Sequence, residues 1–323
     1  MQGCSVLFFF AFASALLAAC ADAPRLPPTQ PAPPASSPCL EPVRRAIAAN
    51  EGDQLFRIDV DGAIAKYGQA NALAPSNHRI VFKLAMAQRK KENWSEVAAL
   101  MERATALAPG FASYWMERGN ALEHLATMGQ GRWEDARAPF ERCIQIDPNF
   151  VDCHEELGTV LDYLDDEAGA LASYTRAIVM GPTVVAHYAV LADLYLRLDR
   201  VRDAEVVLEQ ALAFAPPTRS QNRGLYGVHV LRAQVYQDRG AVDAMIGELE
   251  QAKALAELGS PEALQMFYNL GSTYIKLKPS RTPEAIVMLK AFFALACKGT
   301  EAARYATECE TTVALVTLSG GAL

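Results

Sequence analysis

Small and large apolar residues recur in a fixed order along most of the chain. A small residue stands five positions before each of five prolines. A large apolar residue stands three positions before that small one, and a second small or branched residue stands four positions earlier still. Spacings of three and four residues place these side chains on one face of an α-helix, and the proline ends the helix. The five prolines are Pro75, Pro109, Pro148, Pro182 and Pro216, at separations of 34, 39, 34 and 34 residues.

Each period contains two predicted helices. The residues of the proline-ended helices are Ala63, Tyr67 and Ala70; Val97, Met101 and Ala104; Ala136, Phe140 and Cys143; Ala170, Tyr174 and Ala177; and Ala204, Leu208 and Ala211. The helix before each of the last four carries a pair that ends in a small residue: Leu84-Ala85, Arg118-Gly119, Leu157-Gly158 and Leu191-Ala192. The same pair recurs as Leu270-Gly271 in a later period, whereas the first helix of the first period is degenerate. The third period has five extra residues around 129–133, from which we expect a longer turn between its helices.

This order resembles the tetratricopeptide repeat (TPR), in which small residues let two antiparallel helices approach closely and large residues fill the space between them. The resemblance implies an all-α fold, a right-handed superhelical solenoid of about seven helix pairs, because single repeats bury their apolar faces only by stacking. The expected repeats are 44–77, 78–111, 112–150, 151–184, 185–218, 226–259 and 264–299. A capping helix is expected over 300–315, which closes a solenoid of residues 44–315, and residues 316–323 are expected to form a flexible tail.

The first residues carry a targeting signal. Residues 5–19 form an uncharged apolar run that ends in Leu17-Ala18-Ala19-Cys20, and this run is shorter than the roughly 20 residues that a membrane span needs. Its end resembles the lipobox of bacterial lipoproteins. The resemblance implies a signal peptide over 1–19, cleavage before Cys20, diacylglycerol on the Cys20 sulfur and acylation of the new amine. No Lys or Arg precedes the run, and an ordinary secretory signal is the alternative.

Residues 20–43 are expected to form the lipid-bearing cysteine and a proline-rich tether. Eight prolines fall within 21–42, and such a tract favours an extended PPII conformation over a packed core. Ala21 follows Cys20, in place of the Asp that retains enterobacterial lipoproteins in the inner membrane. The resemblance therefore favours a bacterial cell-envelope protein, anchored by lipid in the outer membrane and facing the periplasm.

Charge and motifs exclude several classes of function. The net charge is −7, whereas nucleic-acid binding needs a basic face, so no nucleic acid is expected as a partner. No zinc-protease motif, phosphate loop or nucleophile elbow is present, so we expect no enzymatic activity and no cofactor. Cys143, Cys153 and His154 offer three metal ligands without a fourth, so no metal site is expected either. An enzyme or metal carrier and a purely structural envelope protein remain rival hypotheses.

Four cysteines form two candidate disulfides. Cys143 lies near the end of one predicted helix and Cys153 near the start of the next, and an exported location permits oxidation. Cys143 is also suited to stay an unbonded core residue, because it takes the small position of its repeat. Cys297 and Cys309 form the second candidate pair, between the last repeat and its capping helix.

The TPR resemblance also implies a binding face, because the first helix of each repeat lines the concave groove in that family. The matching positions are Arg79, Phe82, Met86, Arg89, Asn120, Asp152, Glu155 and Asp162, which run from basic and apolar to acidic. The Lys/Asn/Arg clamp with which chaperone-binding TPRs hold a C-terminal carboxylate is missing, since Met116 stands where a Lys would precede Asn120.

Together these features predict a lipid-anchored, non-catalytic TPR scaffold that binds a periplasmic or outer-membrane protein through its groove. Two kinds of relative remain open. One is the pilotins, lipoproteins that help the secretins of type IV pili or secretion systems assemble. The other is the adaptor lipoproteins that dock peptidoglycan enzymes or proteases.

Overall fold

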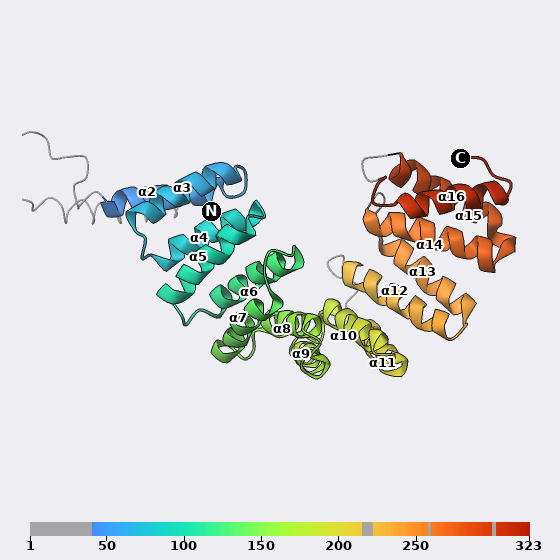
Figure 1. The fold of residues 1–323 in the computed structure, drawn as a ribbon, viewed down its shortest axis with the longest axis horizontal. Helices are drawn as coiled ribbons and strands as arrows, with labels where there is room; N and C mark the ends of the chain where they lie inside the picture. Colours follow the sequence, from blue (N-terminus) through green and yellow to red (C-terminus); the bar gives the residue numbers. More distant parts are fainter. Residues whose placement is uncertain (1–40, 215–221, 258–259, 299–301) are drawn as a thin grey trace, which may run out of the picture. The chain divides into compact units, whose positions relative to one another are not determined.

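The computed structural model describes residues 41–214, 222–257, 260–298 and 302–323 of the 323-residue chain (Figure 1). These residues form helices and connecting turns, with no strand among them. The α-helices are α2 (Glu41–Leu55), α3 (Val60–Leu73), α4 (His78–Lys90), α5 (Trp94–Leu107), α6 (Ala112–Thr127), α7 (Trp133–Ile146), α8 (Val151–Tyr163), α9 (Glu167–Met180), α10 (Val185–Arg197), α11 (Val201–Phe214), α12 (Asn222–Asp238), α13 (Val242–Leu255), α14 (Pro261–Leu277), α15 (Thr282–Phe292) and α16 (Ala306–Leu318). Two short helices, η2 (Pro279–Arg281) and η3 (Phe293–Cys297), flank α15.

The helices follow the predicted repeats. Each predicted repeat holds one pair, from α2 with α3 to α14 with α15, and α16 comes after the last pair. All fifteen small and large positions of the first five repeats are at most 3% exposed, which confirms that they form the core. Pro75, Pro109, Pro148 and Pro182 each stand two residues beyond the end of a second helix. Pro216 lies outside the described residues.

Several boundaries differ from the prediction. The capping helix begins at Ala306 instead of residue 300, and α12 and α14 begin a few residues before their predicted repeats. Helix α2 begins at Glu41, so the last residues of the predicted tether are helical. Helix α16 ends at Leu318, and Val316 is buried, so part of the predicted flexible tail is packed. Gly320 ends this helix in the left-handed conformation (φ 77°), and the Gly321 N–H donates to the Val316 carbonyl. In the third repeat most of the extra residues lengthen α6, which has 16 residues against 13 in α4.

The chain divides into two compact units, Met1–Cys153 and His154–Leu323. In unit 1, as far as it is described, the largest apolar cluster runs from α3 to α6 and includes Tyr67 and Met101. In unit 2 one cluster runs from α8 to α12 around Tyr188, and a second packs α12 to α15 around Tyr274.

A close contact between a glycine and a large side chain joins the helices of several pairs. Gly119 of α6 faces Phe140 of α7, and a methyl group on this glycine would lie 2.6 Å from the ring. Gly158 of α8 faces Tyr174 of α9 in the same way, at 2.7 Å. The same contact joins Gly52 to Tyr67 and Gly271 to Leu289; the matching residues of the other repeats are Ala85, Ala192 and Ala233, all buried. The helices therefore approach closely enough to admit only Gly or Ala there.

The turns inside the repeats share one hydrogen-bonded form. Between α4 and α5, Glu92 adopts a φ of 57°, and the Asn93 N–H donates to the Gln88 carbonyl at 3.1 Å. The same left-handed residue recurs as Gly129, Asp165, Asp199 and Gly240. Each is followed by an N–H that bonds to the carbonyl five residues earlier, which closes the first helix of the pair.

The structure places both candidate cysteine pairs in disulfide geometry. Cys143 and Cys153 have Cα atoms 6.3 Å apart, and Cys297 and Cys309 have Cα atoms 5.8 Å apart. Cys143 also occupies its small core position, fully buried. The first bridge therefore joins α7 to α8 without displacing the repeat packing.

Gly158→Ala should destabilise the protein. The added methyl would meet the buried ring of Tyr174, so the ring or the helix must move. Overpacking of this kind costs about 1–3 kcal/mol, which exceeds the gain of about 1 kcal/mol in helix propensity. We expect a net loss of up to about 2 kcal/mol in the free energy of unfolding, measured by urea denaturation.

Gly247→Ala in α13 is the matched control, because no atom lies within 4 Å of its added methyl. We expect this variant to gain up to about 1 kcal/mol in the free energy of unfolding. Equal effects of the two substitutions would contradict the close approach of α8 and α9.

Removing the Cys143–Cys153 bridge should cost roughly 2–3 kcal/mol, because the bond restricts the unfolded chain. Cys143→Ala with Cys153→Ala removes the bond and keeps a small residue in the core position. Urea denaturation should therefore show a lower midpoint, and a reducing agent should lower the midpoint less in this variant than in the unmodified protein. Free thiols at both positions in protein purified under oxidising conditions would contradict the bridge.

Candidate functional site

The predicted groove residues lie on the first helices of their repeats. Arg79, Phe82, Met86 and Arg89 are on α4, Asn120 is on α6, and Asp152, Glu155 and Asp162 are on α8. We call the side of a pair that its first helix forms the first-helix face. The boundary between the two units falls within α8, so this face is described in each unit separately.

An aromatic cluster of four rings lies on the first-helix face of unit 1: His78, Phe82, Phe111 and Tyr114. The Phe82 and Phe111 rings both stack against the ring of Tyr114, at centroid distances of 4.8 and 5.0 Å. His78 Nδ1 lies 2.9 Å from the Tyr114 hydroxyl. Tyr114 is buried, whereas Phe82 is half-buried and Phe111 is exposed. The cluster therefore offers apolar surface fixed by ring packing, and Met86 adds a half-buried thioether on the same helix.

The cation predicted at Arg89 is already neutralised. Its Nη1 donates to both carboxylate oxygens of Glu117 on α6, at 2.8 and 2.9 Å. Glu117 is 6% exposed. Burial raises the pKa of Glu117 above its ordinary value, and the nearby Arg89 guanidinium opposes that shift. Arg79 differs, because its side chain is exposed and makes no hydrogen bond or ion pair with a described residue.

Asn120 lines a cleft of about 340 Å³ together with Arg89, Trp94 and His124. The Trp94 and His124 rings stack with centroids 3.8 Å apart, and burial lowers the pKa of His124. Asn120 Oδ1 is buried and has no hydrogen-bond partner among the described residues. Asn120 Oδ1 is therefore a buried acceptor without a partner beside this cleft.

The acidic residues predicted on α8 have different surroundings. Asp162 accepts two hydrogen bonds from Arg197 of α10, one of them from Nη1 at 2.9 Å, so its charge is compensated. Glu155 Oε2 lies 2.9 Å from Nδ1 of the buried His187. Asp152 is exposed and makes no ion pair with a described residue. The change from basic to acidic along the face is therefore weaker than the sequence indicated.

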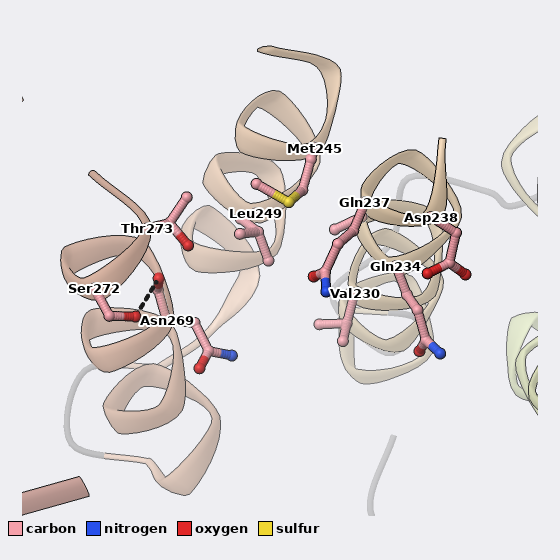
Figure 2. Close-up of a pocket in the computed structure, with 10 residues that line it drawn as sticks. Val230, Gln234, Gln237, Asp238, Met245, Leu249, Asn269, Ser272 and Thr273 are labelled. Carbon is pink, nitrogen blue, oxygen red and sulfur yellow. Dashed lines mark hydrogen bonds between the residues drawn. The ribbon is translucent and has the colours of Figure 1, made fainter. Parts of the chain in front are cut away.

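A further cavity on the first-helix face of unit 2 was not predicted. It has a volume of about 380 Å³ between α12 and α14, and the α13 residues Met245 and Leu249 lie at its floor (Figure 2). Gln237 points into this space from α12, and Asn269 faces it from α14. Ser272 donates to the Asn269 carbonyl at 3.1 Å, while Asn269 Oδ1 accepts from Gln265 at 2.9 Å. The Asn269 amide N–H groups and the Gln237 amide have no partner among the described residues.

The residues that sequence reasoning missed fall into two groups. Trp94, Phe111 and His124 contribute rings from turns or helix ends, outside the positions read from the repeat. The cavity on α12 and α14 lies at the same repeat positions as the predicted residues, but in the sixth and seventh repeats. Reading the groove positions in these two repeats as well would have indicated the α12 residues of this cavity.

The described residues contain neither a metal-binding cluster nor a membrane-spanning helix. No group of three or more His, Cys, Asp or Glu side chains there is arranged to hold a metal ion. No helix in the described part of the chain has the length and apolar character needed to cross a membrane. Cys20 and the segment up to residue 40 lie outside the described residues.

No protein-family model and no curated protein matches the sequence. Solved structures do match. The C-terminal part of a TPR repeat-containing protein from Cytophaga hutchinsonii is 14% identical, with coverage of 79% of this chain and 98% of that chain and a TM-score of 0.57. The structure of pilF from Pseudomonas aeruginosa is 17% identical, with coverage of 70% and 97% and a TM-score of 0.52. A MamA structure is 20% identical over 53% of this chain and 91% of that chain, with a TM-score of 0.49.

At these identities the likeness concerns the fold alone. The helix pairs, their small contact positions and the match to a solved TPR protein agree with one another. The chain therefore has an all-α TPR solenoid fold.

Proposed function

We propose that this chain is a non-catalytic scaffold that binds another protein through its first-helix faces. The aromatic cluster of unit 1, next to the unpaired Arg79, is the observation that carries this proposal. Aromatic and arginine side chains dominate the energetics of protein interfaces, because they bury much area at a few fixed positions. The TPR fold supports the proposal, since stacked repeats present such faces to partners.

The proposal includes a lipid anchor on Cys20 and a periplasmic or outer-membrane protein as the partner. The support for the anchor is the lipobox-like Leu17-Ala18-Ala19-Cys20 and the proline-rich tract that follows it. The two cysteine pairs in disulfide geometry are consistent with a chain exported to an oxidising compartment.

Within this proposal a pilotin-like assembly factor for a type IV pilus or secretion secretin is the first alternative. The lipobox-like Leu17-Ala18-Ala19-Cys20 ahead of a solenoid of helix pairs favours it. An adaptor for peptidoglycan enzymes or proteases is the second alternative, in keeping with a tether that holds the repeats away from the membrane.

Cys20→Ala should prevent membrane anchoring. If Cys20 carries the lipid, the variant lacks the thiol that accepts diacylglycerol, so it should accumulate as a precursor or appear in the soluble fraction. Membrane fractionation and intact-mass measurement check this outcome. The matched control is Cys39→Ala, which should stay membrane-bound. Unmodified protein without a lipid mass increment would contradict the anchor.

Phe82→Ala with Arg79→Glu should abolish partner binding. Truncation of an interface hot spot costs about 2 kcal/mol or more, and a loss of about 1.4 kcal/mol is tenfold in affinity. Affinity capture of the tagged protein from crosslinked cells, quantified by mass spectrometry, should therefore lose the partner. Circular dichroism should show unchanged helicity.

The matched control is Leu107→Ala with Arg57→Glu, which makes the same chemical changes on a second helix and in a turn. Leu107 is 41% exposed, and Arg57 makes no ion pair with a described residue. Capture by this control should equal that of the unmodified protein. Loss of the partner only in the control would show that the binding face is elsewhere.

A further inference from the structure

A small cleft lies between α2 and α4, the first helices of the first two repeats. Its volume is about 210 Å³. Its apolar floor consists of Ala46, Ala49 and Ile80, and its rim carries Arg45, Arg79 and Lys83. The lining therefore combines three cations with apolar side chains and contains no acidic residue.

Two of the three cations are available to a ligand. Lys83 Nζ is held by Asp53, at 2.7 Å from Oδ1. Arg45 and Arg79 make no hydrogen bond or ion pair with their side chains among the described residues. The remaining polar residue of the lining, Asn77, is engaged, because its side chain accepts from the Arg79 and Ile80 N–H groups at the start of α4.

The charge of the surrounding segment is distinct from that of the rest of the chain. Residues 41–92 carry nine Lys and Arg against six Asp and Glu, whereas residues 93–323 carry 20 against 30. Opposite charges attract a ligand toward the site before contact. An anionic ligand is therefore steered to this segment and repelled by the others.

The neighbourhood of the cleft favours a peptide as the source of the anion. Arg79 is close enough to Tyr114 for its guanidinium to oppose the rise in the Tyr114 pKa that burial causes. The cleft thus lies beside the aromatic cluster, and Arg79 and Phe82 are one turn apart on α4. A peptide offers side chains to both surfaces, whereas a lipid headgroup offers only its phosphate to the arginines.

We propose that this cleft binds an acidic peptide segment with aliphatic side chains. A Glu or Asp carboxylate is held between Arg45 and Arg79, because the planar guanidinium group forms paired hydrogen bonds to carboxylates. A neighbouring Leu or Val side chain lies on the floor of Ala46, Ala49 and Ile80. This inference rests on the proposed protein-binding function and specifies the chemistry of the partner segment.

The test is fluorescence anisotropy with the purified full-length protein and the labelled peptide Ser-Gly-Glu-Leu-Glu-Val-Gly-Ser. We expect saturable binding that weakens with added salt, since the contact is ionic. The peptide with Gln in place of both Glu residues should bind about tenfold more weakly or worse, as should Arg45→Glu with Arg79→Glu. Arg45→Gln with Arg79→Gln serves as a milder variant, and circular dichroism shows that each variant is folded.

Arg44→Glu with Arg57→Glu is the matched control, because it changes the net charge equally at unpaired arginines outside the cleft. Its affinity should stay close to that of the unmodified protein. An equal loss in this control, or equal binding of the Gln peptide, would overturn the proposal. The proposal would also be overturned if the peptide did not bind while phosphatidylglycerol vesicles bound in a way that depends on Arg45 and Arg79. Partner capture in cells is a separate measurement. A negative peptide-binding result would therefore overturn the proposed cleft without contradicting the proposed protein-binding function.

Discussion

The close approach of two helices at one small residue is the constraint on which the rest of the structure depends. The first helix of a pair packs closely against the second at this residue, and a large ring fills the space between them. The contacts of Gly119 with Phe140 and of Gly158 with Tyr174 are examples. Overpacking at such a contact is costly, so the position tolerates little change. Packing fixes one side of each first helix and leaves the other side for binding: on α4, Ile80, Val81, Leu84, Ala85 and Ala87 are buried, whereas Arg79, Phe82 and Met86 are exposed or half-buried.

Ion pairs within the first-helix faces then determine which side chains remain for a partner. Glu117 forms an ion pair with Arg89 in unit 1, and Arg197 forms an ion pair with Asp162 in unit 2. Arg45 and Arg79 keep their full hydrogen-bonding capacity toward a ligand. The two units consequently differ in chemistry: unit 1 offers guanidinium groups and rings, and the cavity of unit 2 offers side-chain amides and the carboxylate of Asp238 beside the apolar Met245 and Leu249.

The sequence predicted the features that depend on residues a few positions apart on one helix. These are the helix pairs, their buried positions and the cysteine pairs on adjoining elements. It did not predict which charges are paired, because Arg89 and Glu117 are 28 residues apart and Arg197 and Asp162 are 35 apart, on different helices. The cavity between α12 and α14 was missed because the groove positions were not read in the sixth and seventh repeats, although both repeats were predicted. The residue pattern along one helix does not indicate which charged side chain of another helix it contacts.

Site-specific photo-crosslinking in living cells tests most directly whether the first-helix faces hold the partner. Benzoylphenylalanine at Met116 of α6 or at Gln234 of α12 places a reactive group on these faces, in unit 1 and unit 2, without removing a proposed contact residue of unit 1. At Leu107 or at Val206, which are 41% and 52% exposed, it places the same group on second helices. We expect discrete crosslinked species of the same partner from the first-helix positions and none from the second-helix positions. Crosslinks from Leu107 and Val206 alone would contradict the assignment of the binding face.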